Sequence, residues 1–135
     1  GEIRLLVGVG STRPTRLRKT LYDGFAERGY LFGTLVHPSA VVSPSAVLAA
    51  GAQVLAGCIV QSGVTIGENV ILNTGVSVDH DSIVDAHTHI APRAVLCGGV
   101  KVGQCAHIGP GAILVQNTKI AEDGFVRAGE VVSHA

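Results

Sequence analysis

The sequence predicts a single-stranded, left-handed parallel β-helix built from six-residue repeats, preceded by a small β-α-β segment of a truncated α/β subdomain. Three observations support this prediction. Val, Ile or Leu stands at every sixth position from residue 42 onward, small or β-branched residues stand two positions earlier, and residues 1–36 lack both series. The composition agrees, because 47% of the residues are hydrophobic while only 4% are aromatic and Met and Trp are absent. A core of Val, Ile, Leu and Ala suits a narrow, regular interior.

Residues 1–36 follow an α/β pattern. The apolar run from Ile3 to Val9 is typical of a buried parallel strand, and Gly8, Gly10 and Ser11 then supply a tight turn. A glycine turn before a helix resembles a phosphate-binding turn. The full dinucleotide fingerprint is absent, so a purely structural turn is the alternative.

A helix is expected from about Pro14 to Arg28, with Gly29 as its C-terminal cap, followed by a second strand over residues 31–36. The apolar face of this helix would carry Leu17, Leu21 and Phe25. Four cations cluster near its start and would meet a nucleotide phosphate or form a solvated face: Arg13, Arg16, Arg18 and Lys19.

A lone β-α-β unit cannot cover both faces of its strands. It either packs on the β-helix or belongs to a larger α/β subdomain, and the start at Gly1 without Met favours the second reading. Residues 1–36 are therefore interpreted as the remnant of a nucleotide-sugar-binding subdomain, and residues 37–135 as the β-helix.

The six-residue period is unbroken over the rest of the chain. The large aliphatic series is Val42, Leu48, Val54, Val60, Ile66, Leu72, Val78, Val84, Ile90, Leu96, Val102, Ile108, Leu114, Ile120, Val126 and Val132. The series two positions earlier runs from Ala40 to Glu130, and glycines recur between the two. If three repeats form one coil, residues 18 apart stack at about 4.8 Å. An ordinary β-sandwich has no reason to keep this register through its loops.

Composition excludes several functional classes. The formal net charge is zero, so no basic face is expected for nucleic acid. No apolar run approaches the roughly 20 residues that span a bilayer, and no membrane association is expected. The three cysteines show no CxxC spacing, which is typical of reduced thiols in a cytoplasmic protein.

Histidine has little use inside such a prism, yet the chain has six. His80 lies in the run Val78-Asp79-His80-Asp81 and faces solvent if Val78 points inward. A histidine beside a carboxylate is the minimal general-base unit, because the carboxylate holds one ring nitrogen protonated and leaves the other free to accept a proton. Asp81 is the nearest partner and Asp79 the alternative. The competing interpretation is a polar corner without catalytic function.

His89 follows nine residues after His80, where it would donate to a thioester oxygen or to a cofactor. His107 lies 18 residues, or one coil, beyond His89, so the two residues should lie one above the other on the same face. Ordinary exposed or interface histidines are the alternative for both. His87 and His134 carry no distinct signal.

These residues together resemble bacterial sugar acetyltransferases with hexapeptide repeats, namely the sialic-acid O-acetyltransferases and the nucleotide-4-amino-sugar N-acetyltransferases. The resemblance covers nearly the whole chain. It is carried by the repeats and by three runs, Leu35-Val36-His37-Pro38-Ser39-Ala40, Asn73-Thr74-Gly75 and His89-Ile90-Ala91-Pro92, together with His80-Asp81. The sequence departs from the family pattern in two ways. The N-terminal acidic residues that bind the nucleotide sugar in the family are not seen, and neither is the Gly-Val-Pro-Ala type tail near the cofactor.

The resemblance implies a homotrimer with active sites in clefts between adjacent prisms, using acetyl-CoA as co-substrate and a nucleotide sugar as acceptor. His80 would be the catalytic base and Asp81 would raise its basicity. The acetyl-CoA contacts would be His89, Pro110 and Ala128, and Gly10 would fall in the nucleotide-sugar pocket. No metal is implied.

The sequence thus predicts acetyl transfer from acetyl-CoA to the amino group of a nucleotide-linked sugar. Transfer to a hydroxyl group, as in sialic-acid O-acetylation, would use the same residues. A non-catalytic trimeric scaffold is a second class. A zinc hydratase of the prismatic carbonic anhydrase type is a third, but its resemblance requires a histidine pair five residues apart, and this chain has none.

Overall fold

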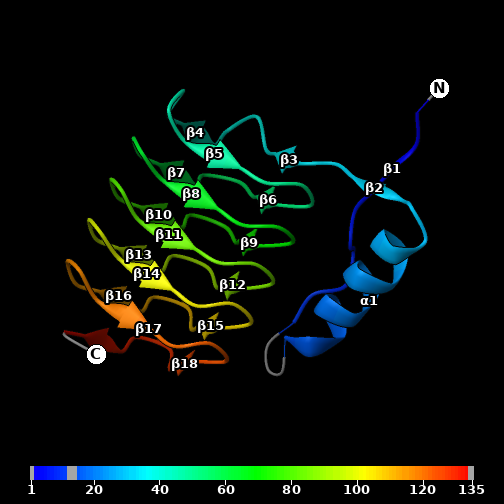
Figure 1. The fold of residues 1–135 in the computed structure, drawn as a ribbon. Helices are drawn as coiled ribbons and strands as arrows, with labels where there is room; N and C mark the ends of the chain where they lie inside the picture. The colour runs from blue at the N-terminus through cyan, green and yellow to red at the C-terminus, as the bar shows by residue number, and fades with distance from the viewer. Residues whose placement is uncertain (1, 12–14, 134–135) are drawn as a thin grey trace.

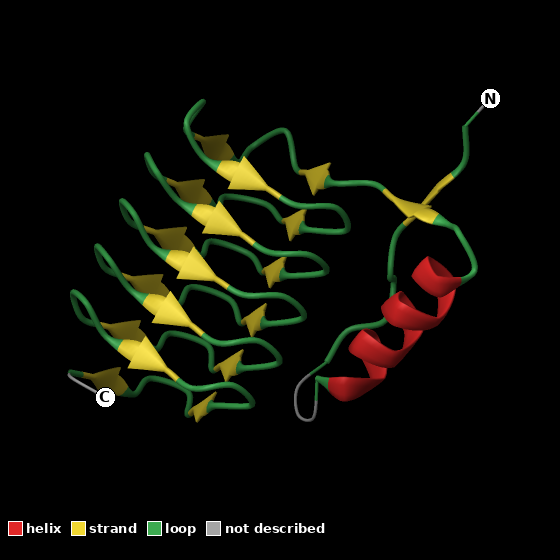
Figure 2. Ribbon diagram, viewed as in Figure 1, coloured by secondary structure: helices red, strands yellow, loops and turns green. Residues whose placement is uncertain are grey.

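The computed structural model describes residues 2–11 and 15–133. It shows a three-sided parallel β-helix with one α-helix lying alongside it (Figures 1 and 2). The α-helix runs beside the row of strands that includes β12, β15 and β18 (Figure 1). The predicted β-helix with a short β-α-β segment before it is confirmed.

The three sides of the prism are three parallel sheets. Face 1 consists of β3 (Leu35–Val36), β6 (Gln53–Val54), β9 (Ile71–Leu72), β12 (His89–Ile90), β15 (His107–Ile108) and β18 (Phe125–Val126). Face 2 consists of β4 (Val41–Val42), β7 (Ile59–Val60), β10 (Ser77–Val78), β13 (Val95–Leu96), β16 (Ile113–Leu114) and β19 (Val131–Val132). Face 3 consists of β5 (Val47–Leu48), β8 (Thr65–Ile66), β11 (Ile83–Val84), β14 (Lys101–Val102) and β17 (Lys119–Ile120).

Strands pair in a register of 18 residues, as the six-residue period predicts. Ile90 pairs with Ile108 on face 1, and Val78 pairs with Leu96 on face 2. The second residue of each strand from β4 to β19 points inward, and these residues form one continuous core with the small series two positions earlier. Members on the first and last coils are only partly buried, because no further coil covers them.

Polar members of the small inner series satisfy their hydrogen bonds inside the prism. The hydroxyl of Ser82 donates to the carbonyl of Cys97 at 3.0 Å, and Thr88 Oγ1 donates to the carbonyl of Gly103 at 2.9 Å. Their burial therefore carries little of the penalty of an unpaired hydroxyl.

The turns repeat as regularly as the strands. Every sixth residue from 51 to 129 has a φ of 56–76°, in the left-handed region. Glycine occupies many of these positions, and the others are Asn69, Asp81, His87, Arg93, Cys105, Asn117 and Asp123. Asn and Asp tolerate this conformation better than most residues, so this corner position can carry a polar side chain.

The β-α-β segment differs from its prediction in three respects. Its first strand, β1 (Arg4–Leu5), is short, and Ile3, Leu6 and Val9 are exposed. The predicted second strand over 31–36 is divided, because β2 (Leu31–Phe32) pairs with β1 while β3 joins face 1. The sheet of β1 and β2 spans two residue pairs, too few to bury the whole apolar run.

The helix α1 (Arg16–Glu27) ends as predicted, with Gly29 at a φ of 87° just beyond it. Its buried face was predicted wrongly. Leu17 and Phe25 are exposed, whereas Arg18 and Tyr22 are buried. The helix packs on a prism edge rich in backbone carbonyls, and an arginine can donate to these groups whereas a leucine cannot. Arg13 lies outside the described residues, as does His134.

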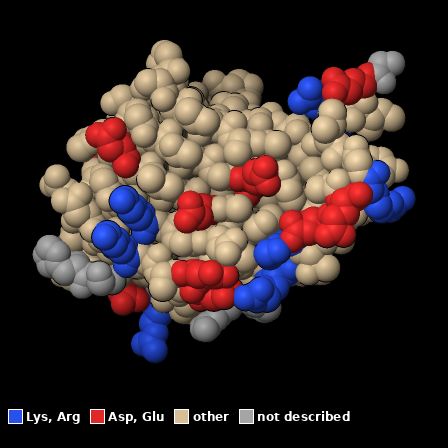
Figure 3. Space-filling model, viewed as in Figure 1, with Lys and Arg blue, Asp and Glu red and all other residues tan. Residues whose placement is uncertain are grey.

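Charged side chains of both signs lie on the face of the molecule seen in Figure 3, adjoining one another on its right side and separated by uncharged areas elsewhere. Arg16 pairs with Asp123 at 2.8 Å, and Lys19 pairs with Asp23 within α1. Within the described part of the chain, no helix has the length and apolar character needed to cross a lipid bilayer.

Candidate active site

His80 lies at the corner between faces 2 and 3, in the turn that joins β10 to β11. Its Nδ1 lies 3.1 Å from Asp81 Oδ2, and the two side chains are 52% and 74% exposed. Asp79 uses its Oδ1 to accept the backbone N–H of His80 at 2.8 Å. The geometry therefore favours Asp81 over Asp79 as the carboxylate partner of the ring. A proton held at Nδ1 leaves Nε2 able to accept another.

Two glycines on neighbouring coils make room for this pair. A Cβ added to Gly98, one coil beyond His80, would lie 2.5 Å from His80 Nε2. A Cβ added to Gly63, one coil before Asp81, would lie 2.2 Å from Asp81 Oδ1. The imidazole edge thus rests on a position that has no side chain. Sequence reasoning missed Gly98, although its spacing of 18 residues from His80 is a usable signal.

His89 occupies a different environment on face 1. It is 7% exposed, its Nδ1 is hydrogen-bonded to the carbonyl of Ser11, and its Nε2 lies 3.2 Å from Asn73 Nδ2. The neutral ring fits both contacts if Nδ1 donates and Nε2 accepts. Burial lowers the pKa of His89, which favours this neutral form. The predicted placement of His89 and His107 on neighbouring strands of one face is confirmed, and the two rings meet edge to face with their centroids 5.1 Å apart.

Gly10 and His89 line the same pocket. A pocket of about 180 Å³, the Gly10 pocket, opens between the N-terminal segment and face 1. It is lined by Val7, Gly8, Val9, Gly10, Gln53, Leu55, Ile71, Asn73 and His89. Gln53 was not singled out from the sequence, and Asn73 was named only within the run Asn73-Thr74-Gly75, without a role. The sequence feature that could have identified both residues is a polar side chain at an outward position of the repeat, next to apolar strands.

Pro110 and Ala128 lie at the corner between faces 1 and 2, one coil apart, and both are exposed. The backbone N–H of Gly129 donates to the carbonyl of Pro110 at 2.9 Å, which keeps these two turns in register. Within one chain, these residues and the Gly10 pocket therefore lie away from the His80 corner. The predicted site residues form two groups on different sides of the prism.

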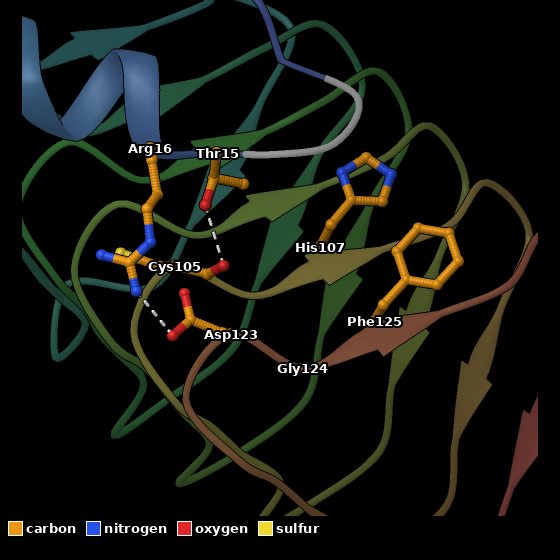
Figure 4. Close-up of a pocket in the computed structure, with 7 residues that line it drawn as sticks. All are labelled: Thr15, Arg16, Cys105, His107, Asp123, Gly124 and Phe125. Carbon is orange, nitrogen blue, oxygen red and sulfur yellow. Dashed lines mark hydrogen bonds and ion pairs between the residues drawn. The ribbon is translucent and has the colours of Figure 1, made fainter.

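A second pocket of about 260 Å³ lies where the start of α1 meets the last coils (Figure 4). Thr15 Oγ1 donates to the carbonyl of Cys105 at 2.8 Å, and the rings of His107 and Phe125 stack 5.6 Å apart. Arg16 and His107, both considered from the sequence, line this pocket, but none of the predicted catalytic, acetyl-CoA or sugar contacts does. Its contacts attach the helix to the prism, so we do not place the chemistry there.

Face 2 adjoins the corner that carries His80, and its outward side chains are mostly apolar. The outward residue of most of its strands is Val or Ile, and several are exposed: Val41, Ile59, Ile113 and Val131. A row of exposed branched aliphatics on a flat sheet is typical of a protein–protein contact.

Solved structures share the fold and much of the sequence of this chain. No protein-family model matches the chain. The chain is similar to the acetyltransferase domain of PglB from Neisseria gonorrhoeae FA1090, with 37% identity and a TM-score of 0.92 over 97% of this chain and 62% of that one. It is also similar to perosamine N-acetyltransferase from Caulobacter crescentus, with 40% identity and a TM-score of 0.92 over 97% of this chain and 61% of that one.

The chain belongs to the hexapeptide-repeat sugar acetyltransferase family. The PglB domain has been solved with acetyl coenzyme A, and the Caulobacter enzyme with CoA and GDP-perosamine. The latter has also been solved with a single histidine replaced by asparagine or by alanine. The present chain spans 61–62% of the length of these relatives. Over residues 2–11 and 15–133, its His, Cys, Asp and Glu side chains form no group of three that could hold a metal ion.

Proposed function

We propose that this protein transfers an acetyl group from acetyl-CoA to the amino group of a nucleotide-linked amino sugar. The observation that carries the proposal is the His80–Asp81 pair resting on Gly98, in a chain 37–40% identical to solved sugar N-acetyltransferases. The alternative acceptor is a sugar hydroxyl, which the same pair would deprotonate. The GDP-perosamine bound to the Caulobacter relative favours the amine.

His80 acts as the general base in this mechanism. Its Nε2 takes a proton from the acceptor nitrogen while that nitrogen attacks the thioester carbonyl carbon. The new C–N bond forms, the C–S bond breaks, and the proton on Nε2 passes to the leaving thiolate of CoA. Asp81 keeps the other ring nitrogen protonated and stabilises the imidazolium that forms transiently.

The active protein is a homotrimer in this proposal. The His80 corner and the Gly10 pocket lie on different sides of one prism, so a base and a bound sugar can meet only if they come from neighbouring copies. The exposed apolar strip on face 2 supplies the contact. Pro110, Ala128 and His89 remain the proposed acetyl-CoA side of the cleft, as the family resemblance implies.

The β-α-β segment serves as part of the nucleotide-sugar-binding subdomain. Its apolar pocket of about 250 Å³, between Val7, Leu21 and Phe25, is open and can accept further α/β structure. We also propose a cytoplasmic location. Cys58, Cys97 and Cys105 are free thiols, which suits a reducing compartment.

The test is His80→Ala, assayed with acetyl-CoA against UDP-, dTDP- and GDP-linked amino sugars. Removal of a general base should lower kcat about 10²- to 10⁴-fold, while light scattering still shows trimers. His37→Ala is the matched control, because His37 is exposed and, among the residues that the structure describes, its ring is hydrogen-bonded only to the neighbouring Ser39. Near-normal turnover by His80→Ala would reject the role of His80, and a monomeric wild type would reject the trimer.

A further inference from the structure

We propose that Gln53, Arg18 and His89 form a clamp on residues 7–11 and thereby set the affinity of the Gly10 pocket for the nucleotide sugar. They act here as positioning residues, His89 in addition to its proposed contact with acetyl-CoA, and the inference rests on the proposed function. Each reaches the backbone of residues 7–11 from outside that segment, two from face 1 and one from α1.

The clamp binds every second carbonyl of the segment. Gln53 Nε2 donates to the carbonyl of Val7 at 2.8 Å, and Arg18 Nε donates to that of Val9 at 3.0 Å. His89 Nδ1 donates to the carbonyl of Ser11. Residues 7–11 contain no regular secondary structure, so these side chains provide the polar contacts that ordinary strand pairing would supply elsewhere.

The two residues between the clamped carbonyls are Gly8 and Gly10. Each has open space where a Cβ would project, and both line the Gly10 pocket. The segment is therefore fixed through alternate residues and leaves bare backbone for a ligand at the others. Backbone without side chains is the surface that sugars and phosphates can approach most closely.

Arg18 is the strongest element of the clamp. It is fully buried, and its further donors bind the carbonyl of Asn69 at 2.8 Å and Asn69 Oδ1 at 2.7 Å. All of these acceptors are neutral oxygens, and burial lowers the pKa of Arg18 to about 10. An apolar side chain would attach α1 to the prism without this desolvation cost. Only a long side chain with a hydrogen-bond donor can reach the carbonyl of Val9 and fix its position. We therefore assign Arg18 a positioning role.

His89 extends the clamp to the wall of the pocket. Its Nε2 accepts from Asn73 Nδ2, and Asn73 Oδ1 accepts the backbone N–H of Thr74 at 2.7 Å. The Asn73 amide is thus held in one orientation, with its edge on the Gly10 pocket. A pre-formed pocket binds more tightly because less conformational entropy is lost on binding.

The test compares Arg18→Met and Gln53→Leu with Thr15→Val. Arg18 does not line the Gly10 pocket, so its effect cannot come from direct contact with the sugar. Thr15 donates one buried hydrogen bond from the N-terminal segment to the prism, but that bond does not touch residues 7–11. Arg18→Lys, which retains a long donor, should restore part of the lost affinity.

We expect the KM for GDP-perosamine, or for the amino sugar that the wild type turns over best, to rise about tenfold in both clamp variants. The KM for acetyl-CoA and the kcat should stay within about twofold of wild type. Thr15→Val should lower the melting temperature without raising either KM. An unchanged sugar KM in both clamp variants, or an equal rise in Thr15→Val, overturns the clamp.

A wild type that turns over no nucleotide amino sugar would instead reject the proposed function. The clamp is then judged by amide hydrogen exchange of residues 7–11. Exchange should increase in Arg18→Met and Gln53→Leu but not in Thr15→Val. Equal exchange in all variants overturns the clamp independently of catalysis.

Discussion

Replacing Gly98 with alanine should move the His80 ring while leaving the β-helix folded. The new Cβ would lie 2.5 Å from His80 Nε2 and 2.7 Å from Cε1, whereas ordinary contact begins near 3.4 Å. The ring edge must therefore shift by about 1 Å, and a misplacement of this size can cost roughly 10²-fold in rate. We expect kcat to fall by about that factor.

The fold should tolerate the change for two reasons. Gly98 is not among the residues with positive φ, so alanine meets no backbone strain there. The atoms it displaces belong to a half-exposed side chain that can rotate, at a cost of about 0.5–1.5 kcal/mol. The melting temperature of Gly98→Ala should therefore stay close to that of wild type.

The assay follows release of the CoA thiol at saturating acetyl-CoA, together with thermal unfolding of each variant. Gly103→Ala is the matched control on the prism. Its Cβ would lie 2.6 Å from the backbone nitrogen of Glu122, which cannot rotate away, so this variant should lose stability. If Gly98→Ala turns over at the wild-type rate while folding normally, the ring position that we assign to His80 is not the one used in catalysis.

Two further predictions concern stability. Leu96→Ala removes a fully buried core side chain and should lower the free energy of unfolding by about 2–5 kcal/mol, measured by urea denaturation; a loss below about 1 kcal/mol would contradict the continuous core. Burial lowers the pKa of both His87 and His89 from the ordinary value of 6.5. The unfolded chain therefore binds more protons than the folded chain below about pH 6.5, so stability should fall as the pH drops from there. The charged groups facing these rings are Asp23, Lys19, Arg18 and Glu68. Melting temperatures recorded from pH 8 to pH 5 check this, and His87→Gln and His89→Gln should each flatten the profile.

The β-helix could be predicted from the sequence because one six-residue period determines both its core and its strand pairing. A six-residue repeat of Val, Ile or Leu specifies the inward side chains, and three repeats specify the 18-residue register that pairs Ile90 with Ile108. The contact between His80 and Asp81 could also be predicted, because adjacent residues at an exposed corner can meet without contributions from distant parts of the chain.

The clamp on residues 7–11 could not be predicted in the same way. Periodicity assigned the apolar residues of α1 to its buried face, and that assignment ignores what the opposing surface offers. Arg18 is buried because Asn69, 51 residues away, and the carbonyl of Val9 accept hydrogen bonds from its guanidinium. Only tertiary structure brings these acceptors together, and a local helical pattern contains no information about them.

The repeat also limits where chemistry can be placed on this fold. Inward positions must be apolar or small, and one position in each turn requires a left-handed backbone that favours Gly, Asn or Asp. Asp81 occupies such a position, with a φ of 61°. The residue that the backbone accepts there is therefore the same one that can orient the ring of His80. A general base is then obtained by changing the residue before an existing Asp corner, provided that the next coil carries glycine beneath it, as Gly98 does.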